Sequence, residues 1–113
     1  MKKVMLEEVK PYAAPGHFDV TAMRLSGKDE TGAKKFWVGL SYFLPAGGAQ
    51  YAYEDSPTEK VYVVLEGELT VKTKTGGITL RPMDTLYIGP NEGREIINKT
   101  NEPVKMLVII SYD

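Results

Sequence analysis

Hydrophobic and polar side chains along the chain follow the two-residue period of β-strands. Residues 18–25 (FDVTAMRL) alternate between apolar and polar side chains, as in a strand with one buried face. Residues 36–44 (FWVGLSYFL) are almost continuously apolar, which predicts a strand covered on both faces. A polar loop, SGKDETGAKK, separates these two segments. The first half of the chain is therefore expected to contain two long strands.

Shorter strand-like segments follow, each bounded by turn residues. The sequence PAGG at 45–48 is expected to break the chain before a short strand at 50–53 and an acidic loop, EDSPTE. Residues 60–74 (KVYVVLEGELTVKTK) read as a hairpin whose tight turn is formed by Glu66 and Gly67. After a turn at 75–77, the remaining strand candidates are ITL, TLYI, REIIN and VKMLVIISY.

The first nine residues are poorly suited to a helix, because they lack an N-cap and are followed closely by Pro11. We expect an extended arm or strand there. The regular spacing of many short strands predicts an all-β sandwich or a closed barrel such as a jelly roll. With no linker or low-complexity tract, residues 1–113 should form a single domain, with 1–17 as the N-terminal arm and 18–113 as the barrel.

Composition narrows the range of partners. The 113 residues are 42% hydrophobic and 26% charged, with a formal net charge of -1, so no basic surface for nucleic acid or an anionic membrane is expected. No cysteine is present, which rules out disulfides and thiolate metal ligands. No apolar run approaches the ~20 residues of a membrane span, and the first residues lack an apolar signal-peptide core. We expect a cytoplasmic protein.

Four segments together resemble the cupin superfamily over residues 36–110: the turn PAGG, EKVYVVLEGELTV, LRPMDTLYIGPNEGREIIN and NEPVKMLVI. The resemblance implies a small double-stranded β-helix, or jelly-roll barrel, with a ligand pocket at its wider mouth. It also implies a homodimer in which the N-terminal strand or arm adds to the partner's sheet.

The resemblance also locates the positions that bind a metal ion in the family. The glutamate of the first motif, seven positions before the glycine turn at Gly67, is replaced by Lys60. The two histidines of that motif fall on Tyr51 and Tyr53, although the acidic loop is longer than the usual spacer. None of these three positions carries the family's metal ligand.

In the second motif, the histidine four positions before Asn98 is replaced by Arg94. A Lys ammonium or Arg guanidinium offers protons and positive charge rather than a lone pair, so a cupin-type iron, manganese, nickel or zinc site should not form. We therefore expect neither a metal nor another cofactor.

If Lys60 and Arg94 point inward, the pocket should favour a small anionic ligand, with Tyr51, Tyr53 and Tyr62 supplying aromatic walls and hydroxyls. The two-residue period puts Tyr62 on the same face as Lys60. In the opposing interpretation, Lys60 and Arg94 point to solvent at the barrel rim and the tyrosines fill the core.

Candidates for proton transfer are His17, Tyr53, Lys60 and Glu59. His17 is the sole histidine and opens the first barrel strand, whereas a lone histidine also serves as a surface or packing residue. Glu59, with its neighbours Glu54 and Asp55, could supply a base or pair with Lys60, or simply belong to a solvated loop. We expect Trp37, Met83 and Met106 to pack in the core.

Three functions remain open. The first is a metal-independent isomerase, epimerase, cyclase or lyase acting on an anionic or aromatic metabolite. The second is a non-catalytic binding protein or accessory subunit, and the third is a barrel kept for its dimer surface. Fold alone does not choose among them.

Overall fold

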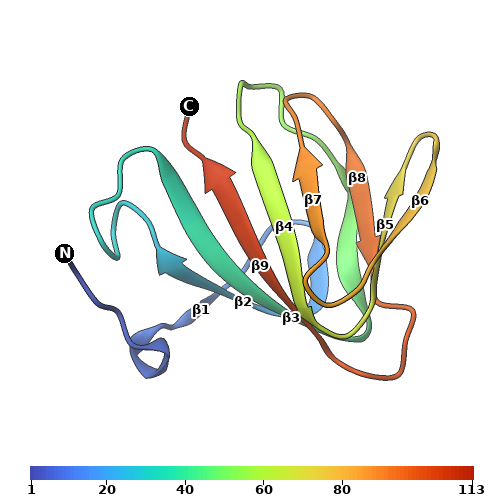
Figure 1. Cartoon of the computed structure of the whole chain (residues 1–113), viewed down its shortest axis with the longest axis horizontal. Coiled ribbons are helices and arrows are strands. Elements are labelled where there is room, and N and C mark those ends of the chain that lie inside the picture. The colour runs from blue at the N-terminus through green and yellow to red at the C-terminus, as the bar shows by residue number, and fades with distance from the viewer.

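The computed structural model describes residues 1–113, and its regular structure is almost entirely strand (Figure 1). In chain order the elements are η1 (Leu6–Glu8), β1 (Pro11–Tyr12), β2 (His17–Ser26), β3 (Phe36–Ala52), β4 (Lys60–Glu66), β5 (Leu69–Thr73), β6 (Gly76–Leu80), β7 (Thr85–Ile88), β8 (Arg94–Ile97) and β9 (Val104–Ser111). The prediction of an all-β fold is confirmed.

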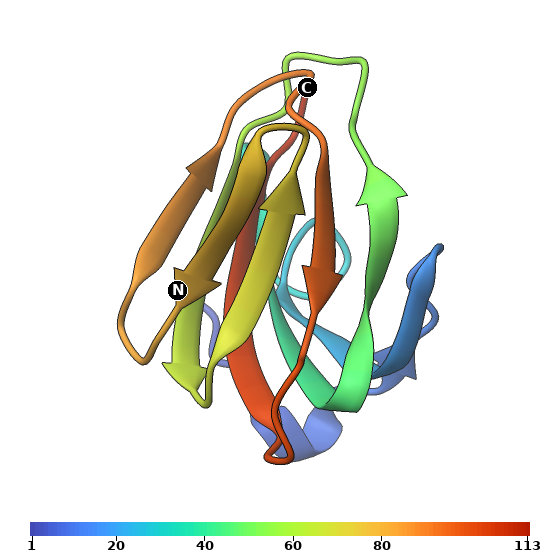
Figure 2. The same ribbon diagram turned by 90° about the vertical axis from the view of Figure 1, so that its right-hand side faces the viewer.

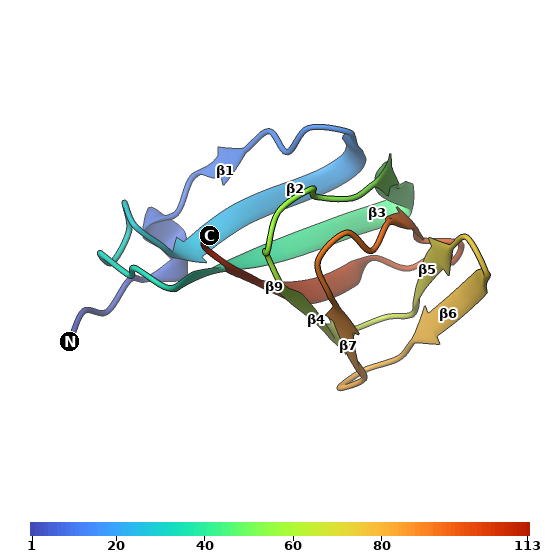
Figure 3. The same ribbon diagram turned by 90° about the horizontal axis from the view of Figure 1, so that it is seen from above.

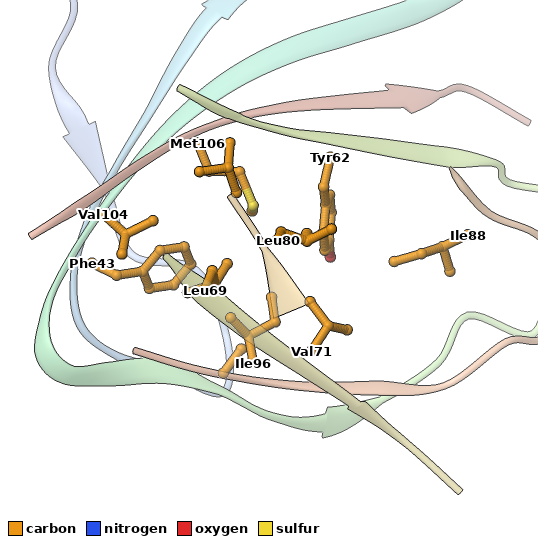
Figure 4. Packing of buried hydrophobic residues seen from close by; sticks show 11 residues of the cluster. Phe43, Tyr62, Leu69, Val71, Leu80, Ile88, Ile96, Val104 and Met106 are labelled. Carbon is orange, nitrogen blue, oxygen red and sulfur yellow. The ribbon is translucent and has the colours of Figure 1, made fainter. Parts of the chain in front are cut away.

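The strands form a nearly closed antiparallel barrel. Their order is β6-β5-β8-β3-β9-β4-β7, with β2 added beside β3 and β1 beside β2. Figure 2 shows β6, β5 and β8 side by side, and Figure 3 shows β1 on the outer side of β2. Eleven buried residues pack together in the interior, with Phe43, Leu69, Val71, Ile96 and Met106 among the most buried (Figure 4).

Strand β3 does not break at residues 45–48, contrary to the expectation from PAGG. It continues to Ala52 and bends at Ala46, whose φ is +68°. Before the bend β3 pairs with β9, and after it the strand pairs with β8. A Cβ atom at Gly48 would overlap the carbonyl oxygen of Ile96, so glycine is required where β3 crosses from one side of the barrel to the other.

The predicted hairpin at Glu66 and Gly67 is also wrong. Strand β4 pairs with β7 and β9, whereas β5 pairs with β6 and β8. Gly67, with φ of +85°, turns the chain between two sides of the barrel instead of joining two paired strands. The true hairpin is β5–β6, in which Thr73 lies opposite Gly76.

The N-terminal arm is mostly extended, as expected, apart from the 3₁₀ turn η1. Its strand β1 pairs with β2 of the same chain, with Tyr12 opposite Ala22. An arm shared between subunits, and the homodimer itself, stay predictions. No helix of the structure is long and apolar enough to span a membrane.

Candidate ligand-binding site

A cavity of about 350 Å³ lies over the inner face of strands β2, β3, β9 and β4. Strand register explains which side chains line it. Lys60, Ile110 and Trp37 share one cross-strand row, and all three line the cavity. The row two residues further along holds Tyr62, Val108, Gly39 and Arg24. Because alternate residues of a strand face the same side, these two rows together form the cavity floor.

Arg94 enters the cavity from the first position of β8 and is only 8% exposed. Its Nε donates to the Tyr62 hydroxyl at 2.9 Å, and its Nη1 donates to the Gln50 carbonyl at 3.2 Å. It forms no salt bridge within 4.0 Å. The interpretation that Arg94 points to solvent is therefore wrong, and its buried charge has no carboxylate partner in the protein.

Lys60 also lines the cavity, and its side chain is 11% exposed. Its Nζ lies 3.5 Å from Oε1 of Glu54, so the acidic loop does pair with Lys60, through Glu54. Burial lowers the pKa of Lys60, Glu54 opposes this shift, and the Arg94 charge adds to it. As predicted, Tyr62 faces inward with Lys60 and is 3% exposed.

His17 lies at the start of β2 and lines the same cavity. Its Nδ1 is 2.9 Å from the Pro15 carbonyl oxygen, which can only accept a hydrogen bond, so Nδ1 carries the proton. Burial lowers the pKa of His17, the hydrogen bond to Pro15 opposes this shift, and the charges of Arg94 and Lys60 add to it. The neutral ring therefore keeps a lone pair on Nε2, as a general base requires.

Of the remaining predicted site residues, Tyr53 lines the cavity, whereas Tyr51 and Glu59 do not. Tyr53 lines the cavity and is 58% exposed. Tyr51 does not line it and instead contributes to a second hollow, which shares only Arg94 with the first. Glu59 lies outside the cavity, where it accepts a hydrogen bond of 2.7 Å from the exposed Tyr87 hydroxyl. The structure thus does not bring Tyr51 and Glu59 to the cavity that holds Lys60 and His17.

The sequence did not predict that Tyr12, Arg24 and Trp37 line the cavity. Trp37 lines the cavity rather than packing in the core, and Arg24 lies over its ring at 4.8 Å and over the Tyr12 ring at 5.2 Å. Sequence alone does not show which rows of neighbouring strands align, and that alignment is what joins these residues to Lys60. Of the two methionines expected in the core, Met106 is buried, but Met83 is 72% exposed.

Comparison with known proteins identifies the class. The family model described as "Cupin domain" matches residues 41–110, so the chain belongs to the cupin family. It is 37% identical over 114 residues to beta-D-galactosidase Rv1717 of Mycobacterium tuberculosis, covering 99% of this chain and 95% of that protein.

Solved structures show the same fold. The polyketide cyclase RemF of Streptomyces resistomycificus matches with a TM-score of 0.86 and 20% identity, covering 100% of this chain and 80% of RemF. A sugar phosphate isomerase from a cupin superfamily of Silicibacter pomeroyi matches with a TM-score of 0.82 and 20% identity, covering 99% and 76% of the two chains.

The residues present do not fit a cupin metal ion. The positions that the resemblance assigns to metal ligands hold Tyr51, Tyr53, Lys60 and Arg94, and the last two offer no lone pair to a cation while protonated. No group of three or more His, Cys, Asp or Glu side chains lies close enough to hold a metal ion. The cavity contains cationic side chains at the point where a family metal would need donors.

Proposed function

We propose that this cupin binds a small anionic metabolite in the cavity between β2 and β4 and moves a proton on it. The observation that carries the proposal is the buried guanidinium of Arg94, which lies beside Lys60 and has no carboxylate partner. A buried arginine that lacks an acidic partner in the protein is well suited to grip the carboxylate or phosphate of a ligand.

The aromatic side chains indicate the rest of the ligand. Trp37, Tyr53 and Tyr62 line the cavity, and flat apolar rings pack well against a sugar or an aromatic ring. A volume of about 350 Å³ is near the lower limit for ligand sites, which run from roughly 300 to 1,000 Å³. The ligand should therefore be about the size of a monosaccharide acid or one substituted ring.

The chemistry follows from the charge states. Arg94 holds the acid group, and Nε2 of His17 removes a proton from the carbon beside a carbonyl group. Lys60 stabilises the negative charge that develops on the carbonyl oxygen. Return of the proton to another carbon, or to the opposite face, gives isomerisation or epimerisation, and loss of a neighbouring leaving group gives elimination.

Glycoside hydrolysis is the second candidate, because a relative that is 37% identical is a beta-D-galactosidase. Most glycosidases use two carboxyl groups at the reacting carbon. The cavity of this chain is lined by one, Glu54, which is already paired with Lys60. A chromogenic β-galactoside tests this reaction, and hydrolysis that is lost in Glu54→Gln would favour it over proton transfer.

The main proposal is tested in two steps. Aromatic and sugar acids are first screened by thermal unfolding, because a ligand stabilises the state that it binds. Each acid that binds and also carries an aldehyde or ketone group is then incubated with the protein in D₂O and followed by NMR. Deuterium uptake that is present in wild type and lost in His17→Gln supports an enzyme.

The other outcomes are equally informative. Binding without deuterium uptake, isomerisation, epimerisation or elimination makes the protein a non-catalytic binder. Absence of binding by every acid in a broad panel overturns the proposal.

A further inference from the structure

Arg24 is the third cation of the cavity. Its guanidinium is stacked against both Tyr12 and Trp37, and its Nε is buried without a hydrogen-bond partner. It forms no salt bridge. Buried polar atoms are almost always hydrogen-bonded, so the unpaired Arg24 donor is free to bind an acceptor from outside the protein, either water or a ligand.

Glu30 is an acidic residue close to Arg24. Its Oε1 and the Arg24 Cδ both lie near Gly27, but no nitrogen of Arg24 is within 4.0 Å of a Glu30 oxygen. The Oε1 of Glu30 is itself buried and unpaired. Glu30 and Arg24 line a separate hollow beside the N-terminal arm, but Glu30 does not line the cavity that holds Lys60 and Arg94. In that cavity the only carboxylate is Glu54, which is paired with Lys60.

Strand register puts Arg24 and Tyr62 at opposite edges of the cavity floor. Both lie in the row that also contains Gly39 and Val108, which places three strand spacings between them. At ~4.8 Å for each spacing, the two backbones are about 14 Å apart as measured along the curved sheet. Tyr62 accepts the hydrogen bond from Arg94, so Arg94 and Lys60 belong to one edge of the cavity and Arg24 to the other.

Gly39 leaves room for the Trp37 ring between the two edges. A Cβ atom at this position would lie 2.9 Å from Cζ3 of Trp37, so the ring passes directly over the glycine. A ligand therefore meets an aromatic surface between two separated sets of cations. The charged residues that line the cavity are three cations and one carboxylate, a net charge of +2 in a chain whose net charge is -1.

We infer that the ligand carries two anionic groups on one ring or short chain, one bound by Arg94 and Lys60 and the other by Arg24. This inference rests on the proposed anion-binding function and deepens it. A dianion would satisfy the unpaired Arg24 donor and neutralise the charge of the cavity, whereas a monoanion would leave one edge unpaired.

Galactonate and galactarate form a matched pair of probes, because they share six carbons and differ only in whether the last carbon is an alcohol or a second carboxylate. Benzoate and terephthalate make the same comparison on an aromatic ring. Titration calorimetry on the full chain should show that at least one diacid binds about tenfold more tightly than its monoacid, since a charge-assisted hydrogen bond is added. In Arg24→Gln the affinities for the diacid and its monoacid should become equal, whatever change the loss of one cation makes to the monoacid affinity.

Two further variants keep the experiment interpretable. Arg24→Lys preserves the charge and should keep part of the preference for the diacid. Lys105→Gln removes a cation that is also stacked on a tyrosine ring, at 5.3 Å from Tyr42, but lies outside the cavity, so the preference should remain intact.

Equal binding of both members of each pair by wild type, or a preference that survives in Arg24→Gln, overturns the inference. In that case Arg94-dependent binding of monoacids would leave the proposed function standing. If wild type binds none of the four acids nor any other in the panel, the proposed function fails together with the inference.

Discussion

Replacing Arg94 with methionine should abolish anion binding while leaving the free energy of unfolding close to that of wild type. Methionine keeps a long flexible chain and removes the charge and the two hydrogen bonds to Tyr62 and Gln50. Such a result would distinguish an arginine retained for a ligand from one retained for the fold.

The expected change in the free energy of unfolding of Arg94→Met is the sum of two opposing contributions. Loss of two hydrogen bonds from a charged donor costs about 1.5–3 kcal/mol each. Removal of a buried charge recovers a desolvation penalty of several kcal/mol, and apolar replacements of buried charged groups are often neutral or stabilising. Because Arg94 has no ionic partner, no other charge is left unpaired, and we expect a net change within about 2 kcal/mol rather than the ~3–5 kcal/mol of a broken buried pair.

Urea unfolding without ligand measures this change, and thermal unfolding with a bound acid measures the loss of binding. At one hundred times its Kd, a ligand stabilises wild type by about 2.7 kcal/mol. At roughly 4 °C per kcal/mol, Tm should then rise by about 10 °C in wild type and by almost nothing in Arg94→Met.

Arg81→Met is the matched control. It removes an exposed arginine that is paired with Glu68, so it should leave the Tm response to the acid unchanged. A loss of more than ~4 kcal/mol in Arg94→Met without ligand would show that Arg94 holds the barrel together. An undiminished Tm response would show that the acid binds elsewhere.

Three other measurements test the cavity and the barrel around it. Because the pKa of His17 is lowered in the folded protein, the unfolded chain binds more protons than the folded protein as the pH drops below about 6.5, so the free energy of unfolding should decrease as the pH is lowered. His17→Gln should reduce this pH dependence, and an unchanged pH dependence would contradict the assignment. Trp37 is the sole tryptophan, so acid binding should change its fluorescence, and an unchanged spectrum on saturation would place the ligand away from it. Asn98 is fully buried and donates to the Phe43, Leu44 and Glu102 carbonyls, so Asn98→Ala should cost about 3 kcal/mol in urea unfolding, whereas a cost below ~1 kcal/mol would refute this role.

Much of the fold could be predicted from local pattern. Alternation in residues 18–25 and the continuous apolar run 36–44 correspond to β2 and the first part of β3, because side-chain burial in a strand follows its two-residue period. The errors occurred at glycines. Gly48 and Gly67 read as ordinary turn residues, but they let the chain cross between the two sides of the barrel, and a turn residue does not reveal which strands will pair.

Only part of the candidate site could be predicted from local pattern. That Lys60 and Tyr62 share one face followed from their spacing within one strand, and the resemblance to the second cupin motif singled out Arg94. Only the structure showed that all three side chains point into the cavity. Glu59 was misplaced because it precedes the first residue of β4, and Tyr51 because it lies where the register of β3 with β8 shifts, between Ala49 and Ala52. The two-residue period does not control side-chain direction at either position.

The sequence by itself determined the class of the protein and the loss of the family's metal ligands, since both depend on residue identity at fixed separations along the chain. Tertiary structure decided that Arg24, Trp37 and His17 share a cavity with Lys60 and Arg94. These residues come from β2, β3, β4 and β8, and their meeting depends on strand pairing and register. Register is set by packing and hydrogen bonding across the whole barrel, so a local pattern of residues does not contain it.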